Sequence, residues 1–277
     1  MNFKKYNNLL ELFFEQYEKQ PKDKIFLSDL KDKNKIFSWH DVKSKVLKLS
    51  NEISKIIQNG DRCLLISENR PEWMISDLSI MLAGGITVPA YTTYLSRDYE
   101  YIINDCNPSV VFVSNDEQFS KIKTICERNS SIKKIFSFEK LTCLDANSYF
   151  NIEKLTLIEN PGEKIKKEIN IKRTDPACII YTSGTQGNPK GVILSHGGIL
   201  SNCEGGYELL KSILEKETRF LTWLPLSHSY EHAVQFIQIA VGAKVFYAES
   251  IDKLIKNMSY CSPHIMTAVP RFYQNLY

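Results

Sequence analysis

The feature that most constrains the fold is the alternation of helical periods with short apolar runs along much of the chain. From Asp41 to Ile57 the apolar residues fall on one helical stripe, and Asn59-Gly60 then supplies a stop. Strands that alternate with helices predict a largely parallel sheet covered on both faces, which is the α/β class. Up to residue 113 we expect helices at 41–57, at 71–83 and from Ser96 to before Asn107-Pro108, with strands at 63–66, 86–88 and 110–113.

A more polar and less regular stretch at 114–174 separates two such alternating parts, 1–113 and 175–277. It holds a helix near 116–128 and a strand near 133–138, and its charged run is typical of a solvated connection. The chain ends in a helical pattern without a stop signal, which predicts the N-terminal portion of something longer. After residue 174 we expect strands at 178–182, 219–224, 243–247 and 265–269, and helices at 197–214, 229–240, 251–258 and from 271.

Composition excludes several classes of protein. With 43% hydrophobic residues the chain can bury a sizeable core, so a disordered or fibrous chain is ruled out. The formal charge of +3 lacks the basic surplus typical of nucleic-acid binding. The seven cysteines are scattered, without a Cys-x-x-Cys pair, as in a reducing cytoplasm. Neither a signal peptide nor a membrane span is expected, because polar residues, glycines and Pro89 interrupt the apolar stretch 75–94.

The segment 181–192, which begins within the last residues of the expected strand at 178–182, carries the clearest chemistry. It reads Tyr-Thr-Ser-Gly-Thr-Gln-Gly-Asn-Pro-Lys-Gly-Val. Its glycines allow backbone N–H groups to approach an anion, and its hydroxyls and lysine suit phosphate oxygens. The segment therefore predicts a polyphosphate-binding loop. The candidate binding residues are Thr182, Ser183, Gly184, Thr185, Gln186, Gly187 and Lys190.

Two common nucleotide-binding loops do not fit this segment. A Walker A loop needs Gly-Lys-Ser/Thr, whereas here Pro189 precedes the lysine and Gly191 follows it. A GxGxxG dinucleotide loop is also absent. On composition alone, a hydroxyl-rich turn between two strands with no ligand stays open.

In its order of residues the segment resembles the signature loop of the adenylate-forming (AMP-binding) superfamily, with Gln186 where the family usually has threonine. Three further stretches are similar to motifs of the long-chain acyl-CoA synthetases, in family order. They are Asn-Arg-Pro-Glu-Trp at 69–73 with Ala-Gly-Gly-Ile-Thr-Val-Pro-Ala-Tyr at 83–91, Leu-Pro-Leu-Ser-His-Ser-Tyr-Glu-His at 224–232, and Val-Pro-Arg-Phe-Tyr at 269–273.

The resemblance implies the large N-terminal domain of an adenylate-forming enzyme, incomplete over 1–277 and without the C-terminal lid domain. It implies a long-chain fatty-acid–CoA ligase of the bacterial type, which forms an acyl-adenylate from ATP and a fatty acid and then transfers the acyl group to coenzyme A. By the same resemblance, residues 182–190 hold the β- and γ-phosphates. His228 lies near the α-phosphate and the acyl carboxylate. A zinc pair of His228 with His232 is not expected, because no third ligand is near.

Several family elements have no counterpart in this sequence. The resemblance implies a Tyr-Gly-x-Thr-Glu motif whose glutamate helps hold Mg²⁺, a ribose-binding aspartate and a lysine on the lid domain, so we expect this chain alone to be inactive. Two alternatives stay open. One is an enzyme that adenylates aryl acids, short-chain acids or amino acids, and the other is a non-catalytic nucleotide-binding remnant. The expected location is the cytoplasm, with acyl chain length, peripheral contact at the inner membrane face and oligomeric state left open.

Overall fold

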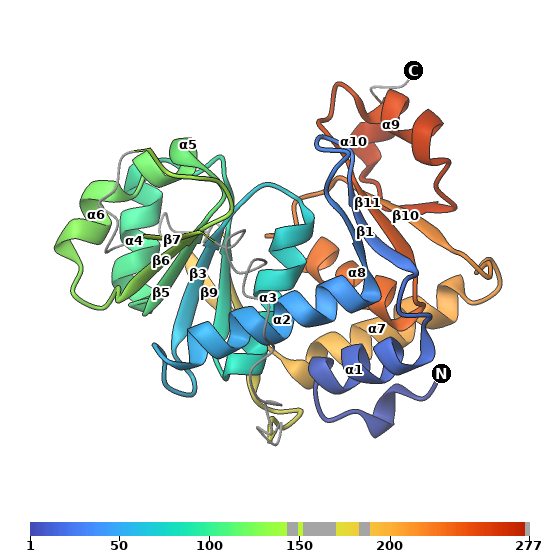
Figure 1. The fold of residues 1–277 in the computed structure, drawn as a ribbon, viewed down its shortest axis with the longest axis horizontal. Helices are drawn as coiled ribbons and strands as arrows, with labels where there is room; N and C mark the ends of the chain where they lie inside the picture. Colours follow the sequence, from blue (N-terminus) through green and yellow to red (C-terminus); the bar gives the residue numbers. More distant parts are fainter. Residues whose placement is uncertain (143–148, 152–169, 183–188, 275–277) are drawn as a thin grey trace. The chain divides into compact units, whose positions relative to one another are not determined.

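Two parallel-rich β-sheets form the framework of the computed structural model, which describes residues 1–142, 149–151, 170–182 and 189–274. Each sheet lies in a separate compact unit. The first unit comprises Met1–Val42, Asn69–Pro71 and Ile199–Tyr277, and the second comprises Lys43–Glu68 and Glu72–Gly198. The expected α/β class, with parallel-rich sheets and covering helices, is confirmed (Figure 1).

The second unit contains a sheet of seven strands in the order β7-β6-β5-β3-β4-β8-β9. Neighbouring strands are parallel except β8 and β9, which form an antiparallel pair at one edge. The strands are β3 (Arg62–Ile66), β4 (Ile86–Ala90), β5 (Val110–Val113), β6 (Lys134–Ser137), β7 (Tyr149–Asn151), β8 (Pro176–Thr182) and β9 (Lys190–Ser195). The associated helices are α2 (Trp39–Ser54), α3 (Pro71–Ala83), α4 (Ser96–Cys106), α5 (Asp116–Ser120) and α6 (Lys123–Arg128).

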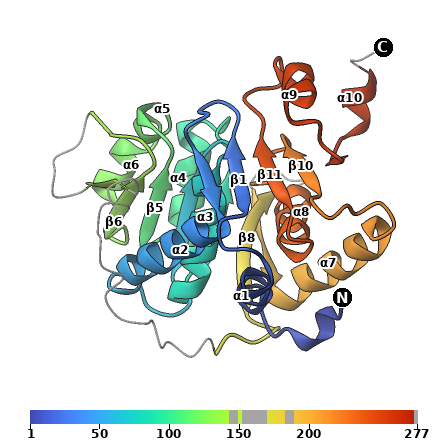
Figure 2. The same ribbon diagram turned by 45° about the vertical axis from the view of Figure 1, so that its right-hand side comes forward.

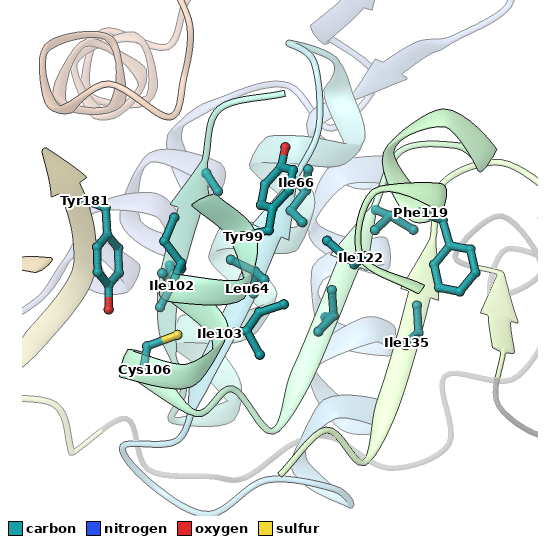
Figure 3. Packing of buried hydrophobic residues seen from close by; sticks show 14 of the residues in the cluster. Leu64, Ile66, Tyr99, Ile102, Ile103, Cys106, Phe119, Ile122, Ile135 and Tyr181 are labelled. Carbon is teal, nitrogen blue, oxygen red and sulfur yellow. The ribbon is translucent and has the colours of Figure 1, made fainter. Parts of the chain in front are cut away.

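The central strands of this sheet are buried along their whole length, as their near-continuous apolar runs predict. Val111 and Val113 of β5 pack in a cluster with residues of α4 and α5, which Figure 3 shows from close by. Phe112 lies between these two residues and therefore points to the opposite face of the sheet, where it stacks on Phe136 of β6 with ring centroids 5.0 Å apart. Both sets of alternating side chains therefore lie in apolar surroundings.

Local signals explain where α3 and α4 begin and end. Pro71 is the first residue of α3, and Gly84 follows the helix with a φ of +89°. An added Cβ at Gly84 would lie 2.7 Å from Asn59 Oδ1, so both strain and space require glycine there. A serine is a common helix cap, and the sequence favours Ser96 as the cap of this helix, but Ser96 is instead the first residue of α4. Leu95 is the N-cap residue, and its N–H donates to the Asp98 carboxylate (2.9 Å).

The first unit contains a sheet of five strands in the order β12-β10-β11-β1-β2. Figure 2 shows β1, β11 and β10 side by side, with α8 next to them. Only β1 and β2 are antiparallel among its described pairs. The strands are β1 (Ile25–Asp29), β2 (Ile36–Ser38), β10 (Arg219–Thr222), β11 (Lys244–Tyr247) and β12 (Ile265–Met266). The helices are the 3-10 helix η1 (Phe3–Lys5), α1 (Leu9–Lys19), α7 (His196–Leu210), α8 (Ser229–Ala240), α9 (Leu254–Cys261) and α10 (Pro270–Gln274).

Three expected elements of the second half differ from their expected bounds by three or more residues. Helix α7 ends at Leu210 rather than 214, and β12 is only two residues long rather than five. Helix α9 begins three residues later than expected, because a turn with bonds from Lys253 N–H to Ser250 O and from Leu254 N–H to Ile251 O precedes it. It ends at Cys261, and the C-cap residue Ser262 has a φ of +41°. None of the helices in the described ranges is long and apolar enough to cross a membrane.

Candidate functional site

An antiparallel hairpin carries the two ends of the predicted phosphate-binding loop. Strand β8 ends at Thr182 and β9 begins at Lys190, and the two residues pair directly across the hairpin. Directly opposite residues have Cα atoms roughly 4.5–5.5 Å apart, and both side chains are exposed. The structure therefore brings Thr182 and Lys190 together at one end of the second unit. The other loop candidates, which are Ser183, Gly184, Thr185, Gln186 and Gly187, lie outside the described residues.

His196, which follows the hairpin, is a buried helix-start residue. It is the first residue of α7, and its N–H donates to Asp175 O (3.1 Å). Burial lowers the pKa of its imidazole to about 4, although Asp77 and Asp175 oppose the shift. The ring is therefore neutral at ordinary pH, and its burial favours a structural role.

His228, the proposed site histidine, is the N-cap residue of α8 in the first unit. Its Nδ1 accepts a hydrogen bond from the N–H of Tyr230 (3.2 Å), and its own N–H donates to Pro225 O (2.9 Å). Because Nδ1 accepts, the neutral ring carries its proton on Nε2. The side chain is exposed, so its imidazole is available to a bound molecule.

The side-chain amide of Asn69 joins two of the motifs found in the sequence. Its Nδ2 donates to Leu224 O (2.6 Å), and its Oδ1 accepts from the N–H of Leu226 (3.0 Å). These bonds hold the segment that leads to His228, across about 155 residues of chain. Asn69, Leu224 and Leu226 all lie in the first unit.

Replacing Asn69 with alanine is expected to lower the free energy of unfolding by about 1 to 3 kcal/mol, because two hydrogen bonds of roughly 0.5–1.5 kcal/mol each are lost. Urea denaturation followed by circular dichroism measures this change. Asn51→Ala, on the exposed face of α2, is the matched control and should change stability by less than about 0.5 kcal/mol. Equal effects of the two substitutions would contradict the assigned role of Asn69.

Thr267 joins the same segment to the third motif. Its carbonyl accepts from Trp223 Nε1 (2.6 Å), and its hydroxyl donates to Glu231 Oε2 (2.6 Å). Phe272 of α10 then contacts Trp223, with ring centroids 5.2 Å apart. The residues on both sides of His228 are thus tied to the chain that follows β12.

Glu231 is the buried carboxyl of this neighbourhood, with 1% of its surface exposed. Burial raises its pKa to about 7, and the bond from Thr267 acts in the opposite direction. Its Oε1 has no hydrogen-bond partner among the described residues. The carboxyl therefore changes its charge near neutral pH, three residues from His228.

The described residues can serve an anionic ligand in two places. Lys190 and the Thr182 hydroxyl lie in the second unit, and His228 lies in the first. A lysine ammonium and a hydroxyl are both donors to phosphate oxygens, and an imidazole can orient a carboxylate. Within the described ranges, no three His, Cys, Asp or Glu side chains gather as a metal site would require.

Sequence reasoning missed the residues that hold these positions. Glu231 and Thr267 carry no local pattern that distinguishes them from other polar residues, and the bond between them spans 36 residues. The motif around Asn69 was recognised, but its contact with Leu224 was not predicted. Asn69 and Glu231 each lie in one of the family-like stretches, and this is the only sequence signal that could have linked them.

Comparison with known proteins gives one family and many relatives. The family model for the AMP-binding enzyme matches residues 13–277. Long chain acyl-CoA synthetase 3 of Arabidopsis thaliana is 32% identical over 253 residues, covering 87% of this chain and 38% of that protein. Long-chain-fatty-acid–CoA ligase FadD15 of Mycobacterium tuberculosis is 28% identical over 225 residues, covering 81% of this chain and 37% of that protein. The chain thus spans well under half the length of these curated relatives.

Solved structures share the fold. A putative long-chain-fatty-acid CoA ligase from Rhodopseudomonas palustris has a TM-score of 0.80 at 17% identity, covering 97% of this chain and 65% of that one. The N-terminal domain of FACL13 from Mycobacterium tuberculosis also has a TM-score of 0.80 at 17% identity, covering 98% and 65%. At this level of identity the likeness shows the fold alone.

Proposed function

This chain belongs to the AMP-binding enzyme family, and from that premise we propose that the complete protein is a long-chain fatty-acid–CoA ligase that forms AMP. The curated relatives named above support the fatty-acid substrate. We further propose that residues 1–277 belong to its large N-terminal adenylate-forming domain. The proposed location is the cytoplasm.

The proposed reaction has two steps. A fatty-acid carboxylate oxygen attacks the α-phosphorus of ATP, the bond to the β-phosphate oxygen breaks, and pyrophosphate leaves. The thiol of coenzyme A then attacks the acyl carbon of the adenylate, AMP leaves, and the thiol proton is released. Such transfers depend mostly on positioning and on neutralising phosphate charge.

The observation that carries this proposal is the pairing of Thr182 with Lys190 at the end of the β8–β9 hairpin. A turn closed at its base by two phosphate donors suits the β- and γ-phosphates of ATP. Lysine serves here as a point charge. We assign the residues between them, from Ser183 to Gly187, to the same binding loop.

We assign His228 to the acyl carboxylate and the α-phosphate. Its place at the N-terminus of α8 adds the positive end of a helix dipole to the imidazole, and both favour an anion. Mg²⁺ would neutralise charge on the triphosphate. No three His, Cys, Asp or Glu side chains of the described ranges gather to hold it, so no step is assigned through it.

The proposal is tested with the complete gene product and a set of carboxylates. We expect pyrophosphate release that requires ATP and a long-chain fatty acid such as palmitate. Repeated turnover should also require coenzyme A. Benzoate, acetate and amino acids serve as controls. Selective activation of one of these control acids would mean that this acid, and not a fatty acid, is the substrate. If no acid supports pyrophosphate release, only nucleotide binding remains as the function.

Lys190→Ala is expected to weaken binding of ATP by about 10- to 150-fold, which corresponds to the roughly 1.5–3 kcal/mol of a charge-assisted hydrogen bond. The dissociation constant for ATP, measured by titration calorimetry on the complete gene product, checks this. Lys55→Ala is the matched control, because Lys55 is an exposed lysine of the same unit that pairs with Glu52. An unchanged constant for Lys190→Ala would remove the loop from the triphosphate site.

A further inference from the structure

The side chain of Tyr181, immediately before the proposed triphosphate loop, points away from the hairpin's exposed end and into the core. It has 3% of its surface exposed and belongs to the apolar cluster that contains Ile102 and Cys106 of α4. Figure 3 shows the ring lying beside this helix. The phenol is therefore held between the hairpin and α4.

The hydroxyl of Tyr181 donates a short hydrogen bond to Asp105 Oδ2, near the end of α4. Burial raises the pKa of Tyr181, and the bond to Asp105 adds to the shift, so the phenol stays protonated as the donor. Asp105 is itself exposed, whereas the ring is not. The bond thus joins the buried root of the hairpin to a carboxylate at the surface, across 76 residues of chain.

The end of α4 is itself fixed to the centre of the sheet. Arg62 of β3 donates from Nε to Cys106 O (2.7 Å) and from Nη2 to Asn107 O (3.4 Å). Asn107 ends the helix in the left-handed conformation, and its N–H bonds to Ile103 O (2.9 Å). Asp105 is therefore a fixed point rather than a free surface side chain.

The opposite strand leaves room for the ring. Gly191 pairs directly with Tyr181, and an added Cβ there would lie 3.2 Å from Tyr181 Cζ and 2.9 Å from Ile179 Cγ2. The backbone of β9 thus lies against the face of the phenol. One side chain contacts both strands at the root of the loop, one residue before Thr182 and one after Lys190.

Strand β8 pairs with β9 as far as Thr182, and it pairs with β4 at Cys178, opposite Thr87. The hydrogen bond from Tyr181 to Asp105 adds a contact with α4 to these pairings within the sheet. The base of the hairpin is therefore held both by the sheet and by a helix.

We propose that the Tyr181–Asp105 hydrogen bond positions the triphosphate loop by fixing its base to helix α4. Fixing the ends of a binding segment in advance reduces the conformational freedom lost when an anion binds, so the bond acts on the affinity for ATP. Tyr181 and Asp105 are positioning residues, and neither touches the substrate. This inference rests on the proposed function of the loop.

The test is a cycle of variants in the complete gene product, with the KM for ATP, the KM for palmitate and the melting temperature measured for each. Tyr181→Phe keeps the ring and removes the donor, and Asp105→Ala removes the acceptor. Each is expected to raise the KM for ATP by about five- to twenty-fold, less than the roughly 10- to 150-fold of a lost charge-assisted contact, because this bond acts on ATP only through the loop. The KM for palmitate should change by less than about two-fold.

Two further variants separate positioning from a general loss of structure. The double variant should be no worse than either single one, because both remove the same bond. Asp105→Asn, which keeps an acceptor oxygen, should restore most of the affinity. Lys190→Ala provides the reference for the loop itself.

Three results would overturn the inference. In the first, Tyr181→Phe leaves the KM for ATP unchanged while Lys190→Ala raises the KM for ATP. This result would leave the proposed function of the loop standing. The second is additive effects in the double variant. The third is a fall in melting temperature with both KM values unchanged. If Lys190→Ala also has no effect, the proposed function of the loop fails first.

Discussion

Replacing Trp39 with alanine is expected to lower the free energy of unfolding by about 3 to 5 kcal/mol, the largest stability loss that we predict for a single residue here. The side chain is fully buried at the start of α2. It stacks on Phe26 of β1 with centroids 3.9 Å apart and an interplanar angle of 5°, and Phe13 of α1 lies 6.1 Å away. Guanidinium denaturation followed by far-ultraviolet circular dichroism measures the loss.

Trp39→Phe is the matched control. It keeps an aromatic ring for Phe26, and it removes the indole Nε1, a buried donor without an acceptor among the described residues. The loss should therefore be less than half of that caused by alanine. Equal losses for the two variants would show that the stacked ring is not what stabilises this part of the unit.

Elements with strong terminating residues could be predicted from the sequence. Helix α3 has its expected bounds, because Pro71 begins it and Gly84 ends it with a positive φ. Strand β5 and helix α8 also have their expected bounds, since each is a clear run of one period. In these places local sequence and tertiary structure agree, which is the condition under which pattern reasoning succeeds.

The pairing of distant segments could not be predicted in the same way. Strand β1 lies beside β11, with Leu27 opposite Val245, and no local pattern specifies that partner. Residues 1–42 contain α1, β1 and β2, for which no element was predicted. Helix α9 was placed three residues too early, because the periodic pattern did not reveal the turn that precedes it.

In the candidate site, too, some residues could be predicted from local sequence and others depend on the fold. The sequence motif predicted the loop residues, and the structure adds that Thr182 lies opposite Lys190. The groups that hold these positions, such as Asp105 and Glu231, come from other elements, because hydrogen bonds between side chains depend on the assembled fold. Their roles become visible only with coordinates.

Glu231→Gln is expected to stabilise the protein at pH 8 by up to about 3 kcal/mol, because an amide avoids the cost of burying a charge. Burial raises the pKa of the Glu231 carboxyl from 4.5 to about 7. At about 1.4 kcal/mol per pKa unit, the ionised carboxylate is disfavoured in the folded state by about 3 kcal/mol. Glutamine also keeps an oxygen that can accept the Thr267 hydroxyl.

The sign of the pH dependence follows from proton binding. The folded protein holds this proton more tightly than the unfolded chain does, so unfolding releases it between about pH 4.5 and pH 7. Stability from this group is present below about pH 4.5 and is lost as the pH rises to about 7. Glu231→Gln should therefore equal the unsubstituted protein at pH 4.5 and exceed it by a margin that grows up to about pH 7 and then levels off towards pH 8.

Denaturation at several pH values from 4.5 to 8 compares the two proteins, with Glu215→Gln as the matched control because Glu215 is exposed in the same unit. The control should follow the unsubstituted protein within about 0.5 kcal/mol. Parallel curves for Glu231→Gln and the unsubstituted protein would contradict the raised pKa. A margin that grows between about pH 4.5 and pH 7 would show that ionisation of this buried carboxyl, three residues from His228, destabilises the folded state.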